Sequence, residues 1–342
     1  MIIYSPRRFG KTSLILETIH RLKKEGFPCI YIDVSTITSK RDFAQRLAST
    51  IAKETSKGIS EAVRKIKENI PKITPKIVLK GEGDMEFFVE FEDKKSDMDK
   101  LLLNLYDLPQ RIAEKKKKKL IVAFDEFQEI QRLDGEDIEK NLRAKIQHHS
   151  DVAYVFMGSK RHLMERIFND KTRAFYKIGK HLSLRMIPKE EFSAFIIKRL
   201  KETGIRIELP LVDEILKITA CHPYYTQMLM HEIWNESYPE RVITAESVKR
   251  GMEQVFLNQE SLFVNLWDSV SSKQRNLLVA LSADEELSLC AQSTIIKYEL
   301  GSAATVNKSL KALENKELVE QKGERYRIQD IFFKEWVKAR GS

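Results

Sequence analysis

The stretch that decides the fold is Ile2-Ile3-Tyr4-Ser5-Pro6-Arg7-Arg8-Phe9-Gly10-Lys11-Thr12-Ser13, in a chain of 342 residues. Its first three residues form an apolar run, a polar loop follows, and Lys11–Lys24 has the spacing of an amphipathic helix that stops at Gly26. This order predicts a short buried strand that turns directly into a helix. The helix is expected to bury the side formed by Leu14, Thr18, Ile19 and Leu22.

The loop between this strand and this helix has the pattern of a phosphate-binding loop. It matches G-x-x-x-x-G-K-[ST], except that Ser5 replaces the first glycine. Gly10 allows backbone amides to turn inward, and the helix N-terminus adds a favourable dipole. Lys11 would neutralise the β- and γ-phosphates, and Thr12 would offer its hydroxyl to Mg²⁺. We therefore expect a nucleoside triphosphate to contact Ser5, Pro6, Arg7, Arg8, Phe9, Gly10, Lys11, Thr12 and Ser13.

A second apolar run, Leu120–Phe124, ends in the acids Asp125 and Glu126. Carboxylates are costly inside a core, so acids that end a buried strand are expected at the edge of the sheet, over a ligand. Asp125 would hold Mg²⁺ through its water shell, and Glu126 would take a proton from the attacking water. The alternative is that both acids cap the helix that follows.

A third apolar run, Val152–Met157, leads to Ser159. A polar side chain on the strand beside the acids can orient the lytic water, so Ser159 joins Glu126 and Lys11 as an expected catalytic residue. Helix capping is the alternative for Ser159. Two cations come next, and they either approach the γ-phosphate or face solvent: Lys160 and Arg161.

The apolar runs predict an α/β fold, a parallel sheet with helices on both faces. They lack alternation and are separated by helical segments, which is typical of strands covered on both sides. Further strands are expected at Cys29–Val34 and His181–Ile187. A hairpin is expected inside the inserted segment 57–95, from Ile77–Leu79 and Phe87–Phe91 around Gly81–Asp84.

The C-terminal part of the chain changes character twice. After Pro188 the strand signals stop, and a small helical lid domain is predicted from Glu190–Lys201, Leu211–Thr219 and Tyr225–Trp234. Three helices and a two-stranded hairpin then give the pattern of a winged helix: Ser272–Ala283, Ala291–Tyr298, Ala304–Asn315, Leu318–Gln321 and Tyr326–Gln329. We expect domains at residues 1–187, 188–260 and 261–342.

The composition is that of a globular protein without a membrane span. Hydrophobic residues make up 42% and charged residues 32%, no apolar run reaches the roughly 18–20 residues of a membrane helix, and no signal peptide opens the chain. Three scattered cysteines without metal-binding spacing favour a reduced, cytoplasmic setting. Lys and Arg exceed Asp and Glu by 59 to 50, which favours polyanions but does not establish nucleic-acid binding.

Together these motifs resemble the archaeal-type ATPases, a prokaryotic P-loop family related to both AAA+ and STAND NTPases. The resemblance covers most of the chain before the tail, and the tail is similar to the family's winged helix. The order of the motifs along the chain makes the resemblance specific. Four stretches carry it: Tyr4–Leu14, Ile121–Gln128, Phe156–Ser159 and Cys221–Gln227.

The resemblance implies ATP rather than GTP as the nucleotide, a helical lid after the core, and a conformational switch driven by the nucleotide state. It also implies that the turn at His222 and Pro223 opens a lid helix near the nucleotide. A plain helix start at Pro223, capped by His222, is the structural alternative.

The chain departs from the family pattern in three ways. Ser5 and Cys221 stand where the family usually has glycine. Lys177 and Lys180 lie where an arginine usually precedes the fifth strand, which argues against an arginine finger in trans. Relatives also carry a segment before the first strand that often touches adenine, whereas this chain begins at that strand. We therefore expect either that the chain is a shortened product or that its affinity for the nucleotide is reduced.

The predicted winged helix suits either DNA or a protein. Its recognition helix, Ala303–Asn315, would expose Thr305, Asn307, Lys308 and Lys311, and its wing would carry Lys322, Arg325 and Arg327. Such residues meet phosphates and base edges of DNA. Winged helices also serve as docking modules for proteins, so both partners stay open.

Three functions remain open on sequence alone. The first is an ATP-hydrolysing switch with a docking tail, as a monomer or a nucleotide-dependent oligomer. The second is a DNA-binding initiator or regulator that ATP only licenses. The third is a nucleotide-binding scaffold that does not hydrolyse. A small-molecule kinase is disfavoured, because the pair Asp125 and Glu126 suits water activation and no acceptor pocket can be named.

Overall fold

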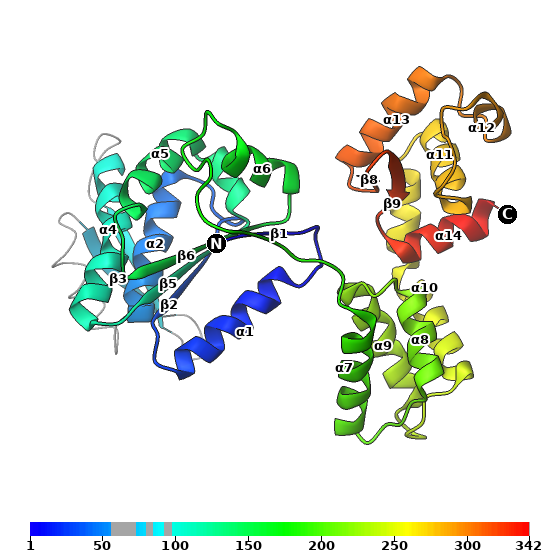
Figure 1. Cartoon of the computed structure of the whole chain (residues 1–342), viewed down its shortest axis with the longest axis horizontal. Helices are drawn as coiled ribbons and strands as arrows, with labels where there is room; N and C mark the ends of the chain where they lie inside the picture. Colours follow the sequence, from blue (N-terminus) through cyan, green and yellow to red (C-terminus); the bar gives the residue numbers. More distant parts are fainter. Residues whose placement is uncertain (56–72, 80–84, 92–97, 342) are drawn as a thin grey trace. The chain divides into compact units, whose positions relative to one another are not determined.

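A computed structural model describes residues 1–55, 73–79, 85–91 and 98–341. The chain divides into two compact units, Met1–Arg185 and Met186–Ser342 (Figure 1). Each unit is described by itself. Among the described residues, no helix combines the length and the apolar character that crossing a bilayer requires.

The first unit is built on a five-stranded sheet in the order β2-β5-β6-β1-β7, with every neighbouring pair parallel. The expected strands are all present, as β1 (Ile2–Tyr4), β2 (Cys29–Asp33), β5 (Leu120–Asp125), β6 (Val152–Gly158) and β7 (His181–Ser183). The last strand is shorter than predicted. Among the described strands it pairs with β1 alone, and the ladder ends where Tyr4 meets Ser183, because β1 itself ends there.

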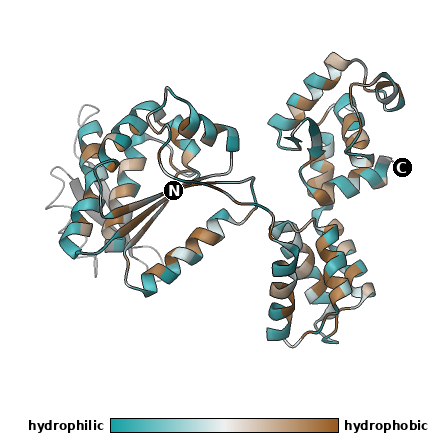
Figure 2. Cartoon of the chain, viewed as in Figure 1, coloured by the Kyte–Doolittle hydropathy of each residue, from teal (hydrophilic) through white to brown (hydrophobic). Residues whose placement is uncertain are grey.

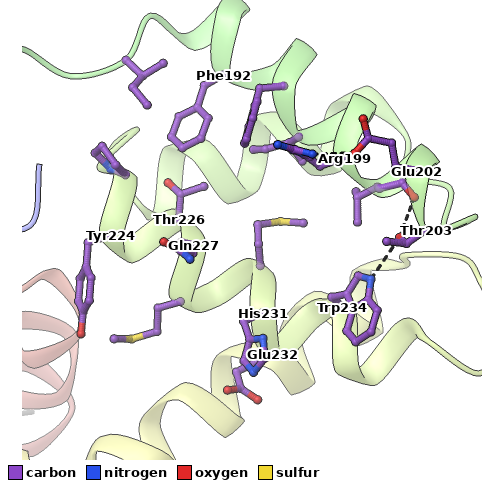
Figure 3. A pocket seen from close by; sticks show the side chains of 17 residues that line it. Phe192, Arg199, Glu202, Thr203, Tyr224, Thr226, Gln227, His231, Glu232 and Trp234 are labelled. Atoms are coloured by element: carbon purple, nitrogen blue, oxygen red, sulfur yellow. Dashed lines mark hydrogen bonds and ion pairs between the residues drawn. The ribbon is translucent and has the colours of Figure 1, made fainter. Parts of the chain in front are cut away.

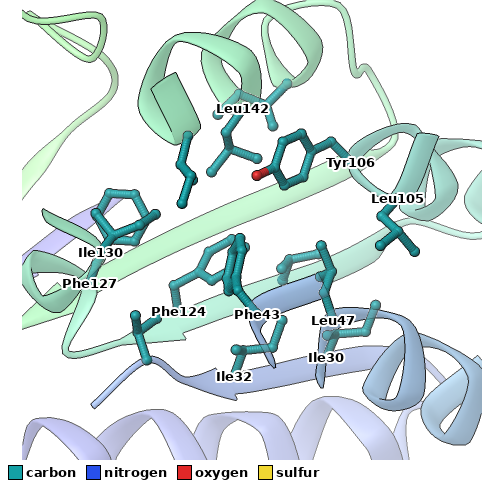
Figure 4. Close-up of a cluster of buried hydrophobic side chains, with 14 of the residues drawn as sticks. Ile30, Ile32, Phe43, Leu47, Leu105, Tyr106, Phe124, Phe127, Ile130 and Leu142 are labelled. Carbon is teal, nitrogen blue, oxygen red and sulfur yellow. The ribbon is translucent and has the colours of Figure 1, made fainter. Parts of the chain in front are cut away.

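Helices cover both faces of this sheet, as predicted (Figure 1). One face carries α1 (Lys11–Lys24), whose buried side chains pack on β1, β5 and β6. The other face carries a larger cluster of buried side chains (Figure 4). It is built by α2 (Lys40–Thr55), α4 (Met98–Lys116), η3 (Phe127–Arg132), α5 (Gly135–Ile146) and α6 (Arg161–Asn169).

The buried side of α1 differs from the prediction. Ile15 and Ile19 are buried, whereas Leu14 is 45% exposed and Thr18 is also exposed. Positions 15, 19 and 22 form one stripe at helical spacing, and Leu14 and Thr18 lie to its side. The stripe therefore faces the sheet, and the prediction for Leu14 and Thr18 was wrong.

An aromatic cluster fixes the segment that follows β5. Phe124 stacks on Phe156 with ring centroids 5.6 Å apart, and Phe127 lies 4.7 Å from Phe156. Phe124 and Phe127 point into the same buried cluster (Figure 4). These contacts hold the start of η3 against β6. They fix the position of the two acids, of which Asp125 ends β5 and Glu126 precedes η3.

The inserted segment contains the expected antiparallel hairpin. Its strands, β3 (Ile73–Leu79) and β4 (Met85–Phe91), pair in register from Ile73 with Phe91 to Leu79 with Met85. The predicted turn residues Gly81–Asp84 lie outside the described residues.

The second unit is helical, with one small hairpin. Its buried side chains form one continuous cluster, and apolar residues gather on the inward sides of its helices (Figure 2). Tyr225 illustrates this continuity, because its ring lies 5.7 Å from that of Phe332 and its hydroxyl donates to the carbonyl of Gln329 at 3.3 Å. The elements are α7 (Lys189–Glu202), α8 (Leu209–Ile218), α9 (Pro223–Ser237), α10 (Ala245–Asp268), α11 (Ser272–Ala283), α12 (Gln292–Lys297), α13 (Ala303–Asn315), β8 (Val319–Lys322), β9 (Arg325–Ile328) and α14 (Ile331–Gly341).

Helix α10 was not predicted, and it runs unbroken across the expected boundary at residue 260. A capping box at Thr244 and Ser247 starts it. The division of this unit into separate lid and winged-helix domains therefore stays a prediction, since one helix and one core serve both parts.

An open groove of about 920 Å³ lies within this unit, lined by residues of α7 and α9 (Figure 3). Its walls are mainly apolar and include Phe192, Phe195 and Met228. At one end Trp234 donates to the hydroxyl of Thr203 at 3.2 Å.

Candidate active site

The sheet brings three loops to one edge. Strands β1, β5 and β6 are parallel, so their carboxyl ends lie together, with Tyr4 in register with Gly158 and Asp33 in register with Asp125. The residues that follow these strands are the predicted phosphate loop, the acid pair and Ser159. Their shared position is the one expected of a ligand site in a parallel sheet.

The backbone of the phosphate loop turns at two positions. Gly10 has φ of 81° and Arg8 has φ of 66°, both in the left-handed region. Nothing lies within 4 Å of a Cβ built on Gly10, so its backbone conformation, rather than lack of space, requires glycine. Ser5 has no positive φ, and the serine therefore fits where the pattern has its first glycine.

Lys11 is folded into its own loop. It is only 5% exposed, and Nζ donates to the carbonyl oxygens of Ser5 at 2.9 Å and Pro6 at 3.0 Å. Burial lowers the pKa of Lys11, and the nearby carboxylates of Glu126 and Asp125 act in the opposite direction. A buried ammonium group whose hydrogen bonds, among the described residues, go to neutral oxygens suits an incoming anion, which would form stronger charge-assisted hydrogen bonds.

The N-terminus of α1 is also open to an anion. Its N-cap residue is Gly10, which has no side chain, and the first bond of the helix runs from the amide of Leu14 to the carbonyl of Gly10. The amides of Lys11, Thr12 and Ser13 therefore precede the first helical hydrogen bond. Such amides and the helix dipole form an anion site.

Asp125 is the centre of a hydrogen-bond cluster and is 2% exposed. Its Oδ2 accepts from the hydroxyl of Thr12 at 2.7 Å and from the hydroxyl of Tyr31 at 2.8 Å, and its Oδ1 accepts from the amide of Glu126 at 2.9 Å. Burial, followed by the hydrogen bond to Asp125, raises the pKa of Tyr31, so its phenol stays a donor. The oxygen donors of Thr12 and Asp125 suit Mg²⁺, which binds through few carboxylates and keeps its waters.

Tyr31 was missed by the sequence argument. The signal lay in the strand register, since Tyr31 pairs with Ala123, two residues before Asp125 in the adjacent strand. Alternation along both strands then puts Tyr31 and Asp125 on the same face. Strand order is needed to see this, and the sequence does not supply it.

Glu126 and Ser159 meet, as the sequence argument requires. The hydroxyl of Ser159 donates to Oε2 of Glu126 at 2.7 Å, and its amide lies 3.3 Å from the same oxygen. Glu126 has φ of 48°, a left-handed conformation that is uncommon for a residue with a side chain. It is the N-cap residue of η3 but makes no side-chain cap, and Lys160 rather than Ser159 is the N-cap residue of α6. Neither Glu126 nor Ser159 therefore makes a side-chain cap in the described residues, and their catalytic roles stay predictions.

The two cations after Ser159 have acidic partners. Lys160 donates to Glu129 at 3.0 Å, and Arg161 donates to Glu165 at 2.8 Å. Glu129 also pairs with Arg132 at 2.9 Å. Both cations are thus engaged by carboxylates of their own unit.

His222 and Pro223 lie in the second unit. Pro223 begins α9, and His222 is the N-cap residue without a side-chain cap. The ring of His222 packs against Tyr225, with centroids 4.5 Å apart. Cys221, at the family's glycine position, has φ of 53°. The proximity of this turn to the nucleotide stays a prediction.

The residues predicted for the recognition helix and the wing lie on α13 and the β8–β9 hairpin. On α13, Asn307, Lys308 and Lys311 are exposed, but Thr305 is half-buried. On the hairpin, Lys322 is exposed, while two arginines form ion pairs: Arg325 with Glu286 and Arg327 with Glu320.

The fold and the cluster around Lys11, Thr12 and Asp125 define a P-loop nucleotide-binding protein. Residues 1–229 match the family model described as an ATPase domain predominantly from Archaea, and the chain belongs to this family. Residues 261–339 match a model described as a probable winged helix domain. No curated protein matches the chain.

Solved structures show the same fold. A Walker-type ATPase of Pyrococcus abyssi is 14% identical with a TM-score of 0.67, and the match covers 99% of this chain and 90% of that one. The ORC2 protein of Aeropyrum pernix in its ADP form is 16% identical with a TM-score of 0.50, and the match covers 100% of this chain and 88% of that one. At such identities the similarity concerns the fold alone.

Proposed function

We propose that the chain binds ATP with Mg²⁺ at this edge of the sheet and hydrolyses it to ADP and phosphate. The observation that carries the proposal is the bond from Thr12 to Asp125 at 2.7 Å, with Glu126 next in the chain and bound to Ser159. It joins the loop that would hold the phosphates to the carboxylates that would serve the metal and the water.

Each residue has a role that follows from its position. Lys11 and the first amides of α1 bind the β- and γ-phosphate oxygens, and Thr12 and Asp125 hold the metal. When bound, Mg²⁺ supplies positive charge that neutralises the phosphate oxygens. Water attacks the γ-phosphorus, Glu126 takes its proton, and the bond from the γ-phosphorus to the bridging oxygen breaks, so that ADP leaves. Ser159 orients the carboxylate of Glu126 through its hydroxyl.

Turnover by the parent, Lys11→Ala and Glu126→Gln tests this proposal. Lys11→Ala should weaken ATP binding by about 1.5–3 kcal/mol, roughly ten- to hundred-fold, because a charge-assisted contact is lost. Glu126→Gln should keep ATP binding and lose turnover by about 10²- to 10⁴-fold. Parent turnover no higher than that of Lys11→Ala would refute hydrolysis, and retained ATP binding would then favour the non-hydrolysing scaffold.

For the winged helix we propose docking of a protein partner under control of the nucleotide state. Over residues 261–342, twelve Lys and Arg residues face eleven Asp and Glu residues, so the tail does not carry the positive excess of the chain. Arg325 and Arg327 are already paired with acids. A surface that binds duplex DNA needs several Lys or Arg side chains that can contact phosphates. The affinity of such a surface for DNA falls steeply as the salt concentration rises.

Duplex binding measured between about 50 and 200 mM salt tests this second proposal. We expect weak binding with a shallow salt dependence. Tight binding that falls by roughly 10³-fold or more over this range would instead favour duplex DNA as the partner of the winged helix.

A further inference from the structure

Gln128 touches the proposed general base. It lies on η3, is 1% exposed, and its Nε2 donates to Oε2 of Glu126 at 2.5 Å. The same nitrogen lies 3.5 Å from Oε1 of Glu129, whose carboxylate is held by Lys160 and Arg132. The amide of Gln128 therefore faces two carboxylates, which fixes its nitrogen toward Glu126.

Gly158 is the residue that makes room for this amide. A Cβ built at position 158 would lie 2.1 Å from Oε1 of Gln128. Gly158 has no positive φ, so the backbone conformation does not require glycine there. Glycine is required there because a Cβ would occupy the space of the Gln128 side chain. The last residue of β6 and the buried amide thus fit each other directly beside Ser159.

The carbonyl oxygen of the Gln128 amide does not add to stability through a hydrogen bond. Oε1 of Gln128 is buried without a hydrogen-bond partner in the described part of the chain. An unmet buried acceptor lowers the free energy of unfolding, and an apolar side chain of equal length would avoid this cost. A glutamine kept here for packing alone would be a poor choice, whereas a donor aimed at Glu126 explains it.

Within the described part of the chain, the three hydrogen bonds to the carboxylate of Glu126 fall on one oxygen. Ser159 supplies two of them and Gln128 the third, and all reach Oε2. Building on the proposed hydrolysis, we propose that Gln128 is a positioning residue, which together with Ser159 holds Oε2 and so presents Oε1 of Glu126 to the attacking water. Gly158 takes part by admitting the amide.

The first test replaces Gln128 with methionine, which keeps the length of the side chain and removes the donor. Gln128→Met should leave the affinity for a fluorescent ATP analogue and the KM unchanged. It should lower kcat roughly ten- to hundred-fold, because the position of the base affects the chemical step and not the binding of ATP. Its Tm should equal or exceed that of the parent, since the unmet acceptor is gone. The matched control is Gln147→Met at an exposed glutamine, which should change none of these values.

The second test uses the fit between Gly158 and Gln128. Gly158→Ala should displace the amide and lower kcat to a similar extent, while ATP binding persists. In a Gln128→Ala background, Gly158→Ala should add little further loss of kcat, because the two changes break the same contact. Met164 also lies close to the built Cβ, and its flexible side chain can move aside.

The outcomes separate this inference from the proposed function. Parent turnover at the Lys11→Ala background would refute the function itself. An active parent with an equally active Gln128→Met variant would refute only the role of Gln128, as would a fall in Tm with unchanged kcat. If Gln128→Met does not fold, Gln128→Glu decides, since it keeps the shape and places an acceptor against Glu126. Undiminished kcat in that variant would overturn the inference.

Discussion

Thr12 and Asp125 are 113 residues apart in sequence, and the hydroxyl of Thr12 donates to Oδ2 of Asp125 at 2.7 Å. The bond connects the first turn of α1 to the end of β5. It sets the spacing between the phosphate loop and the acid pair.

Replacing Thr12 with valine removes only the hydroxyl. Thr12→Val should raise the Mg²⁺ concentration needed for ATP binding and turnover by roughly ten- to hundred-fold, since a metal ligand and its hydrogen bond are both lost. The measurement is a Mg²⁺ titration of nucleotide fluorescence, in parallel with turnover. Thr18→Val is the matched control, because that exposed threonine bonds only its own helix, at the carbonyl of Leu14. An unchanged Mg²⁺ requirement in Thr12→Val would exclude the metal role.

Tyr31→Phe should have a related effect without touching the metal directly. Loss of the phenol donor at 2.8 Å leaves Asp125 less firmly oriented, so the Mg²⁺ requirement should rise by about ten-fold. The free energy of unfolding should fall by about 1.5–3 kcal/mol, the usual worth of a hydrogen bond to a charged group. Tyr4→Phe, on strand β1 of the same sheet, is the control. Equal Mg²⁺ titrations for Tyr31→Phe and the parent would contradict this role.

A buried ion pair ties α5 to the segment before β7. Arg173 donates to Glu139 through Nη2 at 2.5 Å and Nε at 3.1 Å, and Glu139 is 1% exposed. Arg173→Met should lower the free energy of unfolding by about 3–5 kcal/mol, because it leaves a buried carboxylate unpaired. Chemical denaturation measures this loss. Arg161→Ala breaks an exposed pair with Glu165 and should cost only about 0.3–0.5 kcal/mol.

Adding Glu139→Gln to Arg173→Met should restore part of the lost stability, since the unpaired charge is then removed. A double variant less stable than Arg173→Met alone would show that packing, rather than charge, dominates this site.

His149 makes the first unit sensitive to acid. Burial lowers its pKa, and the carboxylate of Asp107 opposes this while Lys145 adds to it. The unfolded chain therefore takes up a proton at a pH of about 6.5, where folded His149 is less protonated than in the unfolded chain. Its contribution to stability is present above this pH and is lost as the pH falls through the folded pKa. Unfolding measured at about pH 8 and about pH 5.5 should show a smaller acid loss for His149→Gln than for the parent. Identical losses would contradict the assignment.

The phosphate loop and the acid pair could be predicted because neighbours in sequence decide them. Gly10, Lys11 and Thr12 are placed at a helix N-terminus by the strand and helix on either side, and Asp125 by the end of its own strand. Their mutual contact needed only the rule that parallel strands end at one edge.

The supporting residues could not be predicted in the same way. Tyr31 reaches Asp125 only because β2 lies beside β5, and Gln128 reaches Glu126 only because the chain turns at a left-handed residue into η3. Leu14 was placed on the wrong side of α1 because apolar residues occupy more of the helix than the sheet can cover. Strand order and local backbone angles are properties of the folded chain.

Helix α10 extends over 24 residues with no break between the α7–α9 bundle and the β8–β9 wing. A joint needs a segment that bends more easily than its surroundings, and an unbroken helix packed into a shared core offers none there. We therefore expect α10 to resist bending between these two parts of the second unit.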